Sequence, residues 1–440
     1  MRTRTVDITT RLQLLDAFRC AHQADTALAA ADRSFHRSTR ATARALASAG
    51  ACEQQLAAAR DIPQALTASA ALDDARQAHL DCTAGHRKAH DRLCRAFTAS
   101  RRANRELAAR YRPHARGRGT SGKRRSSVTA GLLDEVVAMP LELIRAADVL
   151  LVQSSGGKDS LVMLHRIATW ADRAGCTDKV VVVHCDLGDN SEWPGVRELA
   201  QRQAERYGLR FVAVDSTGGL LGLVEKRGMF PDSARRLCTS SLKRDRANVL
   251  LTEVVAALGL DRQALVLNCM GLRAAESPAR SRKSPLAIDT RASNNKRLVL
   301  TWHPILELSE TAVWQTIADE TLEYHPAYDA LMPRLSCVFC VLAGFDVLVR
   351  AVRLCWALEL PLPEQYTDLE ARIGHRFKEQ YSLADVVAEA HRAEVREGPL
   401  IWNRGDALCA QLGDDTAAAY LERMADCESE AYLKRVSLAV

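Results

Sequence analysis

The sequence predicts an α/β protein with a doubly wound parallel sheet, preceded by a helical region and followed by a helical extension. Three observations support this prediction. From about residue 129, short apolar segments alternate with helix-length segments, which is typical of a parallel sheet covered by helices on both faces. Residues 1–111 are rich in alanine and arginine and repeat apolar residues at helical spacing. Residues 351–440 show helical spacing as well.

Changes in composition divide the chain into four expected parts. Residues 1–111 should form a helical hairpin or a coiled coil, although their heptads are irregular. Residues 112–128 combine turn-forming residues with dense positive charge, which predicts a flexible basic linker. Residues 129–350 should form the nucleotide-binding sheet domain. Residues 351–440 should either cover the sheet or form a small helical domain.

Five strands are expected in the sheet domain. The segments 160–174 and 193–207 lie between strands and are long enough to be helices in right-handed crossovers. In such sheets, ligands bind at the carboxyl ends of the strands, near the point where strand order reverses. The expected strands are residues 149–153, 180–184, 210–214, 264–268 and 298–302.

Composition restricts the class of protein. No apolar run approaches the roughly 20 residues that cross a bilayer, so we expect no membrane span. The first residues lack a continuous apolar segment of the secretory type, so we expect a cytoplasmic protein. Its 13 cysteines fit a metal or cluster site and buried thiols better than a disulfide framework. The net charge of +6 permits a polyanionic partner.

A glycine-rich loop follows the first expected strand directly. Paired glycines let backbone amides approach an anion closely, and the start of the next helix adds free N–H groups and a favourable dipole. Ser155 and Ser160 can donate from their hydroxyls, and Lys158 supplies a cation. Asp159 could cap the helix or help to hold Mg2+. The loop should bind phosphate, with a purely structural turn as the alternative.

The hexapeptide Ser155-Gly156-Gly157-Lys158-Asp159-Ser160 in this setting resembles the PP-loop of ATP pyrophosphatases and phosphoadenosine phosphosulfate (PAPS) reductases. Similarity to the reductase-like branch covers roughly residues 145–345. The resemblance implies an adenine nucleotide α-hydrolase-like fold and a loop that grips the phosphates of ATP or an adenylyl sulfate, with Lys158 and Asp159 as catalytic residues. The resemblance to the family also rests on six other parts of the sequence. They are Asp186-Leu187-Gly188, Arg236-Leu237-Cys238-Thr239 with Lys243, residues 271–280, Trp302-His303-Pro304-Ile305, His325-Pro326-Ala327-Tyr328-Asp329 and residues 337–340.

The resemblance also implies contacts outside the loop. Asp186 would contact the adenosine or its ribose, with a capped turn as the alternative. Lys243, Arg273 and Arg280 would bind phosphate or sulfate. The two arginines would share one face of a helix and could form forked hydrogen bonds. Simple pairing with Glu276 is the alternative, and an intervening proline weakens the helix premise.

Three cysteines are candidate metal ligands. Cys337 and Cys340 alone form a weak motif that also suits a redox pair or two core residues. Cys238 lies in a segment that resembles the cysteine-bearing stretch of the family, so folding could bring the three together. By resemblance, they would hold a [4Fe–4S] cluster with one open iron. Zn2+ and plain thiols are alternatives, and Cys355, which reads as part of a core helix, is a candidate fourth ligand.

The chain departs from sulfate reductases because its last residues lack their Glu-Cys-Gly-x-His-like tail. It resembles stand-alone PAPS-reductase-like proteins and, more distantly, the sulfur-transfer component of DNA phosphorothioation systems. We therefore expect ATP, with Mg2+, to be cleaved to AMP and pyrophosphate while an acceptor is adenylated for sulfur transfer. A nucleic acid and a sulfur donor such as a cysteine desulfurase are possible partners. A PAPS or adenylyl sulfate (APS) reductase and a non-catalytic nucleotide-binding subunit are the alternatives.

Overall fold

The computed structural model describes residues 8–58, 62–111, 140–216, 218–232 and 236–427, with some side chains inside the N-terminal helices excepted. The chain divides into two compact units. One comprises residues 1–132 with 293–298, and the other comprises residues 133–292 with 299–440. The expected basic linker, residues 112–128, lies outside the described residues. No helix within the described ranges is both long enough and apolar enough to span a membrane.

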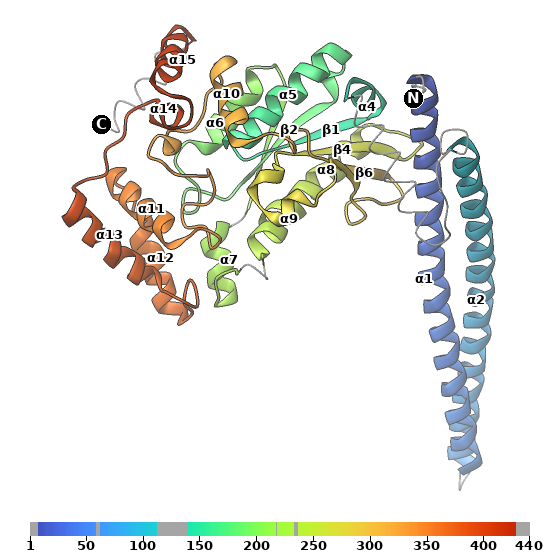
Figure 1. Cartoon of the computed structure of the whole chain (residues 1–440). Coiled ribbons are helices and arrows are strands. Elements are labelled where there is room, and N and C mark those ends of the chain that lie inside the picture. The colour runs from blue at the N-terminus through green and yellow to red at the C-terminus, as the bar shows by residue number, and fades with distance from the viewer. Residues whose placement is uncertain (1–7, 59–61, 112–139, 217, 233–235, 428–440) are drawn as a thin grey trace. The chain divides into compact units, whose positions relative to one another are not determined.

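The N-terminal region is a hairpin of two long helices, α1 (Ile8–Ala58) and α2 (Ile62–Tyr111). Figure 1 shows them side by side. Ser38 Oγ lies 3.1 Å from His86 Nδ1, and Thr42 Oγ1 donates to the carbonyl of Cys82 at 3.2 Å, so the helices run antiparallel. The helical expectation for this region is confirmed, and it takes the hairpin form.

The second unit is built on a six-stranded sheet in the order β3-β2-β1-β4-β6-β5. Strands β1, β2, β3 and β4 pair in parallel, and β5 pairs antiparallel with β6. Strand order reverses between β1 and β4, which is the expected place for a ligand. The strands are β1 (Val149–Ser154), β2 (Val180–Asp186), β3 (Arg210–Asp215), β4 (Ala264–Met270), β5 (Leu286–Ile288) and β6 (Arg297–Trp302).

The five expected strands are all present, and the doubly wound α/β prediction is confirmed. Each observed strand matches its expected segment to within two residues at either end. Strand β5 was not predicted, because a three-residue strand at the edge of a sheet is too short to show a periodic pattern. The helix expected at 193–207 is shorter, since α6 covers Val196–Glu205.

Helices cover both faces of the sheet. Figure 1 shows α4, α5, α6 and α10 on one face and α8 on the other. Successive side chains of β1 point to opposite faces of the sheet, so they contact the two helix layers in turn. On one face, Val149 and Leu151 pack with Leu250 and Val254 of α8. The helices around the sheet are α4 (Pro140–Ala146), α5 (Lys158–Ala174), α6 (Val196–Glu205), α7 (Gly219–Arg227), α8 (Asp245–Ala257), α9 (Pro278–Ser281) and α10 (Glu310–Asp319). Short turns are η1 (Thr177–Lys179), a π-helix η2 (Cys238–Arg244), η3 (Ala274–Glu276) and η4 (Pro326–Tyr328).

The C-terminal helices form a second apolar core. Phe339, Cys355 and Tyr366 are each fully buried in this core, which also contains Trp193 and Phe230 from the sheet domain. The C-terminal segment therefore packs on the loops beside the sheet. Its helices are α11 (Phe345–Ala357), α12 (Leu362–Ile373), α13 (Leu383–Glu397), α14 (Asp406–Leu412) and α15 (Asp414–Cys427).

Candidate functional site

The glycine-rich loop joins β1 to α5, and serine hydroxyls hold its backbone amides. The N–H of Ser155 donates to Ser160 Oγ at 3.2 Å, that of Gly156 to Ser154 Oγ at 3.3 Å, and that of Gly157 to Ser155 Oγ at 3.4 Å. These distances lie at the long end of the normal range, so each bond is weak. Phosphate oxygens could replace the serine oxygens as acceptors at little cost.

Glycine is required at two places around the loop. Gly156 has φ +71°, a left-handed conformation that side chains disfavour. Gly271, directly after β4, approaches the loop so closely that a Cβ there would lie 2.8 Å from the carbonyl oxygen of Asp159. The backbone just after β4 therefore contacts the backbone of the first turn of α5, without room for a side chain at Gly271.

Lys158 is buried, with 1% of its surface exposed. Its Nζ donates to the carbonyl of Pro333 at 3.1 Å and lies 3.3 Å from Glu310 Oε1. Its backbone N–H donates to Tyr328 Oη at 3.0 Å, and its ammonium stands 5.1 Å from the centre of the Tyr328 ring. Lys158 is therefore fixed at the loop by Tyr328 and Glu310.

Asp159 and Arg273 form an ion pair beside this lysine. Arg273 Nε lies 2.5 Å from Asp159 Oδ1, and Arg273 is only 4% exposed. Glu310 Oε2 lies 3.8 Å from an Arg273 terminal nitrogen, so Glu310 faces both cations. The structure thus brings Arg273 to the loop as expected, and it places a guanidinium on the Asp159 oxygen that was considered for Mg2+.

Arg280 has different surroundings. Its guanidinium pairs with Glu276, which also accepts from the backbone N–H of Arg273 at 2.9 Å and lies 3.2 Å from Arg334. Burial alone would raise the pKa of Glu276, but these donors hold it below its ordinary value. Because Pro278 starts the separate helix α9, residues 273–280 do not form one helix. The helical premise was therefore wrong, and Arg280 has the Glu276 pairing considered as its alternative.

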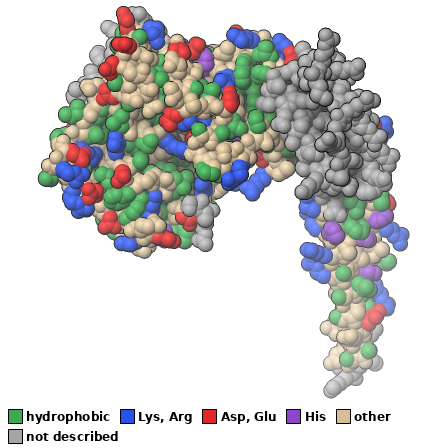
Figure 2. Space-filling view, viewed as in Figure 1, with side chains coloured by type: hydrophobic (Ala, Val, Ile, Leu, Met, Phe, Trp, Pro, Cys, Tyr) green, Lys and Arg blue, Asp and Glu red, His purple; other side chains and the backbone are tan. Residues whose placement is uncertain are grey.

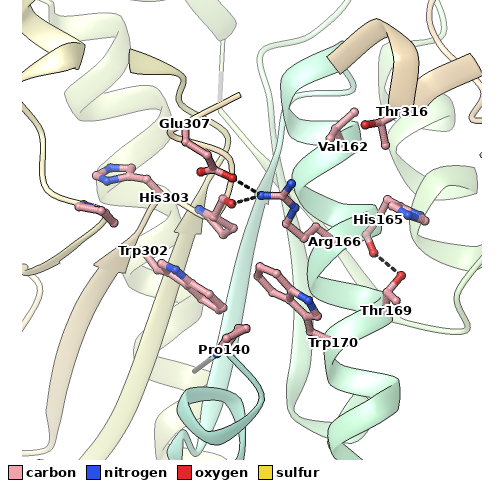
Figure 3. Close-up of a pocket in the computed structure, with 12 residues that line it drawn as sticks. Pro140, Val162, His165, Arg166, Thr169, Trp170, Trp302, His303, Glu307 and Thr316 are labelled. Atoms are coloured by element: carbon pink, nitrogen blue, oxygen red, sulfur yellow. Dashed lines mark hydrogen bonds and ion pairs between the residues drawn. The ribbon is translucent and has the colours of Figure 1, made fainter. Parts of the chain in front are cut away.

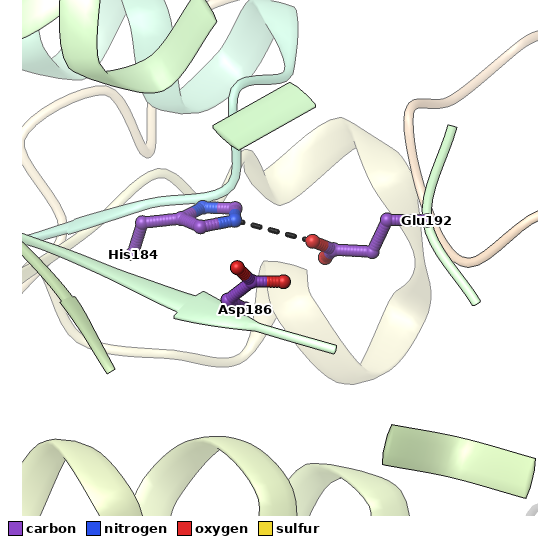
Figure 4. A group of neighbouring side chains, drawn as sticks. All are labelled: His184, Asp186 and Glu192. Carbon is purple, nitrogen blue, oxygen red and sulfur yellow. Dashed lines mark hydrogen bonds and ion pairs between the residues drawn. The ribbon is translucent and has the colours of Figure 1, made fainter. Parts of the chain in front are cut away.

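Asp186 lies at the end of β2, where it holds the following turn. Its Oδ1 accepts from the N–H of Gly188 at 2.8 Å, and its Oδ2 accepts from Arg197 at 2.9 Å. Figure 4 shows Asp186 beside His184 and Glu192, whose side chains point toward each other. One ligand atom from each of these three residues lies within 4.8 Å of the other two. His184 and Glu192 were not predicted; their spacing around Asp186 was the available signal.

Two of the candidate cysteines, Cys238 and Cys337, share the surroundings of Lys243, and Cys340 lies near Cys337. Cys238 begins η2 and Lys243 lies near its end, so the π-helix presents both residues. Burial would lower the pKa of Lys243, but Cys337, Glu192, Cys185 and Cys238 raise it above its ordinary value. Burial raises the pKa of Cys337 to about 12, against the opposing effect of Lys243.

The Cys337–Cys340 segment is tied to the loop after β2. The N–H of Val338 donates to the carbonyl of Ser191 at 2.9 Å, which sets the segment next to Glu192. Cys185 also belongs to the surroundings of Lys243 and was not predicted. Cys355 is fully buried within α11, in agreement with its interpretation as a core residue.

The spacing of the three cysteines bears on which group they suit. Tetrahedral zinc with bonds of about 2.3 Å would hold its sulfur ligands roughly 3.8 Å apart. Among the described residues, His184, Asp186 and Glu192 are the group of three ligand atoms within 4.8 Å of one another, and the cysteines form no such group. As they lie, the three thiols are therefore not all within the spacing that one zinc ion requires.

A separate pocket lies elsewhere on the same unit. It has a volume of about 670 Å³ and is lined by residues of α5, α10 and the segment after β6 (Figure 3). Trp170 stacks on Trp302 with ring centres 5.5 Å apart. Arg166 donates to Glu307 at 2.6 Å and to the carbonyl of Pro304 at 2.7 Å. None of its lining residues is a predicted site residue, so this pocket is not the phosphate site.

Comparisons with known proteins agree with the site. Residues 149–343 match the family model for the phosphoadenosine phosphosulfate reductase domain, and this range contains the loop, Arg273 and all three candidate cysteines. Together with the strand order, this match identifies the adenine nucleotide α-hydrolase-like fold. No curated protein matches the chain.

Two solved structures of Candida glabrata FMN adenylyltransferase also resemble the chain. One contains FAD and inorganic pyrophosphate; it is 11% identical, covers 51% of this chain and 67% of its own, and has a TM-score of 0.31. The other contains FMN and the ATP analogue AMPCPP; it is 11% identical, covers 51% of this chain and 68% of its own, and has a TM-score of 0.30.

Proposed function

We propose that this chain, whose residues 149–343 form a phosphoadenosine phosphosulfate reductase domain, binds ATP at its glycine-rich loop and cleaves it to AMP and pyrophosphate. One observation carries the proposal. The loop holds three backbone amides on weak serine contacts, beside the buried cations Lys158 and Arg273. Such a set of donors suits a polyphosphate, since each serine contact can be exchanged for a stronger bond to a charged oxygen.

In this proposal, the loop and its two cations bind the β and γ phosphates of MgATP. Glu310 faces both cations, so phosphate oxygens would replace its carboxylate when the nucleotide arrives. Asp159 keeps Arg273 in place, and Asp186 seats the adenosine at the end of β2. Neutralising the charge that develops on pyrophosphate lowers the barrier to its departure.

The chemical step is nucleotidyl transfer. An acceptor oxygen attacks the α-phosphorus of ATP, the bond from that phosphorus to the bridging oxygen breaks, and pyrophosphate leaves with the electron pair. The acceptor is then an adenylate, in which AMP is a good leaving group. A thiol reductant releases sulfide from the persulfide of a donor such as a cysteine desulfurase. The sulfide attacks the adenylated centre and forms the new bond to sulfur, while the bond to the AMP oxygen breaks and AMP leaves with that electron pair.

Cys238, Cys337 and Cys340 are the residues that would hold a [4Fe–4S] cluster. Cys238 and Cys337 both act on Lys243, and Cys340 lies near Cys337, which supports placing the three thiols at one site. Such a cluster, bound through three thiolates, would supply an open iron where sulfide can bind. The cation of Lys243 would stabilise negative charge on the thiolates, which is the ionised form that metals require.

The N-terminal hairpin supports a nucleic acid as the acceptor. Arg33, Arg37, Arg40 and Arg44 are spaced by four, three and four residues, so they share one face of α1, and all four are exposed. Residues 33–52 contain no acidic side chain. Figure 2 shows Lys, Arg and His side chains along the described part of the hairpin. A rigid row of cations suits a phosphate backbone.

The proposal is tested with α-labelled ATP. Full-length protein should release labelled AMP and unlabelled pyrophosphate when MgATP, a nucleic acid and sulfide are present, because AMP leaves the acceptor only when sulfur displaces it. Lys158→Met should abolish this release, whereas Lys226→Met, an exposed lysine on α7, should leave it unchanged. Absence of AMP with every acceptor, despite tight ATP binding, would favour the non-catalytic subunit. Release of labelled sulfite from sulfur-labelled PAPS would favour the reductase.

A further inference from the structure

The buried ring of His184 contacts a backbone carbonyl on one side and a carboxylate on the other. It is fully buried at the end of β2. Its Nδ1 lies 3.1 Å from the carbonyl oxygen of Ser154, at the start of the glycine-rich loop that is proposed above to bind phosphate (the phosphate loop). A carbonyl can only accept, so Nδ1 carries the ring proton. In the neutral ring, Nε2 therefore presents a lone pair.

This lone pair faces a carboxylate. His184 Nε2 lies 3.2 Å from Glu192 Oε2, and both atoms are acceptors in the neutral ring and ionised carboxylate. Two buried acceptors at this distance need a positive charge between them, which is either a second ring proton or a metal ion. Asp186 supplies a third ligand atom, an oxygen within 4.8 Å of the other two, and a single shared proton would leave this oxygen unused.

We propose that His184, Asp186 and Glu192 bind a divalent first-row transition ion, of the Mn2+ or Zn2+ type, at the carboxyl end of β2. The backbone carbonyl that holds Nδ1–H is the arrangement found behind most metal-bound histidines, because it fixes the tautomer and the ring. Neighbouring ligands about 2.1 Å from one ion lie about 3 Å apart in octahedral geometry. The 3.2 Å between His184 and Glu192 fits this spacing.

The mixed ligand set selects the class of ion. Mg2+ and Ca2+ prefer sites made of oxygen alone, whereas imidazole with carboxylates suits Mn2+, Fe2+ and Zn2+. The site is therefore distinct from the Mg2+ that accompanies ATP as part of the substrate.

The charges around the triad indicate that the ion binds together with a polyphosphate, so this part rests on the proposed function. Arg197 pairs with Asp186, and Lys243 interacts with Glu192, so two cations already balance the two carboxylates. A dication would need further negative charge. The phosphate loop begins at Ser154, which His184 contacts, so bound phosphates could supply that charge and complete the coordination.

Mn2+ is the probe because its binding and its ligands are both visible by electron paramagnetic resonance. Full-length protein stripped with EDTA is titrated with Mn2+, with and without a non-hydrolysable ATP analogue. We expect one bound Mn2+ per chain, an affinity raised about 10-fold by the analogue, and nitrogen modulation from a bound imidazole. Zn2+ should displace the Mn2+.

Variants of one loop provide matched controls. Glu192→Gln keeps the size of the side chain and should weaken Mn2+ binding by at least about 10-fold. Asp189→Asn removes an exposed carboxylate in the same loop and should leave binding unchanged. The nitrogen modulation in the unmodified protein tests His184 without any variant, so a folding defect cannot obscure the result. Equal Mn2+ binding by both variants, or no nitrogen modulation, would overturn the proposal.

The same titrations separate this inference from the proposed function and from a ribose contact. Analogue binding in EDTA without any Mn2+ binding would overturn the metal site alone. Failure to bind the analogue would overturn the proposed function. The nitrogen modulation would still show whether His184, Asp186 and Glu192 bind the metal ion. If Asp186 is an ion ligand, Asp186→Asn weakens Mn2+ binding, and its effect on analogue binding in EDTA reports the adenosine contact separately. Weaker analogue binding in EDTA with unchanged Mn2+ binding would assign it to the ribose instead.

Discussion

Arg273 Nε lies 2.5 Å from Asp159 Oδ1, an ion pair that joins the segment after β4 to the first turn of α5. Arg273 is buried and Asp159 is 18% exposed, so water screens the pair poorly. Because these elements flank the point where strand order reverses, the pair fixes a cation at the edge of the phosphate loop.

Removing this guanidinium should weaken ATP binding far more than removing that of Arg280. Charge-assisted bonds of about 1.5–3 kcal/mol predict a loss of roughly 10- to 100-fold for Arg273→Met. Arg280→Met should have a smaller effect, because Arg280 pairs with Glu276. Affinities measured with a fluorescent ATP analogue check this. Arg273→Met also removes the nearer cation of Asp159 and leaves it only Lys158, whose Nζ lies 3.8 Å from Asp159 Oδ2, so Asp159→Asn/Arg273→Met should recover stability without recovering affinity. Equal affinity losses in the two single variants would contradict the assignment.

Gly271→Ala should destabilise the sheet domain. A Cβ at this position would lie 2.8 Å from the carbonyl oxygen of Asp159, and backbone cannot move aside as a side chain can. Overpacking of this kind costs about 1–3 kcal/mol. Gly222→Ala is the control, because a Cβ there meets nothing within 4 Å inside α7, and it should stabilise by about 0.5–1 kcal/mol. If the backbone contact is real, the change in unfolding free energy measured with urea should have opposite signs in the two variants.

Asp329 should make stability depend on pH. Burial raises the pKa of this carboxyl to about 6, despite hydrogen bonds from Tyr324 and from the N–H of Ala407 that favour the ionised form. The folded state therefore holds a proton that the unfolded state releases near pH 3.8. Between these values the folded state binds more protons, so this group's contribution to stability falls as pH rises and then levels off above about pH 6.

The loss amounts to about 3 kcal/mol, at 1.36 kcal/mol for each pKa unit. Asp329→Asn keeps an oxygen for Tyr324 and carries no charge, so it should lack this pH dependence. The difference in unfolding free energy between the two proteins, measured at pH 4 and pH 7, isolates the contribution of Asp329. A difference that does not change with pH would show that Asp329 is ionised in the fold throughout.

Cys337→Ser/Cys340→Ser should lose bound iron and sulfide. Protein purified without oxygen is expected to contain both, with Cys238 as the third ligand, and the double variant removes two of the three thiolates. Cys94→Ser, an exposed cysteine of α2, is the control and should retain the full iron content. Elemental analysis decides between iron and zinc. Finding zinc alone would indicate a structural metal site at the cysteines. Finding no metal would indicate that the three cysteines are plain thiols.

Local sequence was sufficient to predict the sheet and its loop. Strands such as β1 are continuous apolar runs because both faces are buried, and Gly156 after β1 has a left-handed conformation that favours glycine. The hexapeptide at residues 155–160 is also continuous in the sequence, so it can be identified without knowing what lies around it. These features depend on neighbours in sequence, so they could be predicted before the structure was known.

The partners of each functional side chain depended on the tertiary structure. Tyr328 reaches the amide of Lys158 across 170 residues of chain, and Glu310 faces the same lysine from the start of α10. Cys238 shares the surroundings of Cys337 only because η2 lies beside the segment that Ser191 anchors. Of the two arginines seven residues apart, the proline turn sends Arg273 to the loop and leaves Arg280 with Glu276.

The sequence by itself therefore determined the fold class and the phosphate loop, because both follow from hydrophobic periodicity and from backbone conformations encoded within a few residues. Only the tertiary structure decided which charges surround that loop and which side chains could share an ion. Electrostatic and coordination contacts act over a few ångströms in space, and the order of the strands brings distant residues to one edge of the sheet.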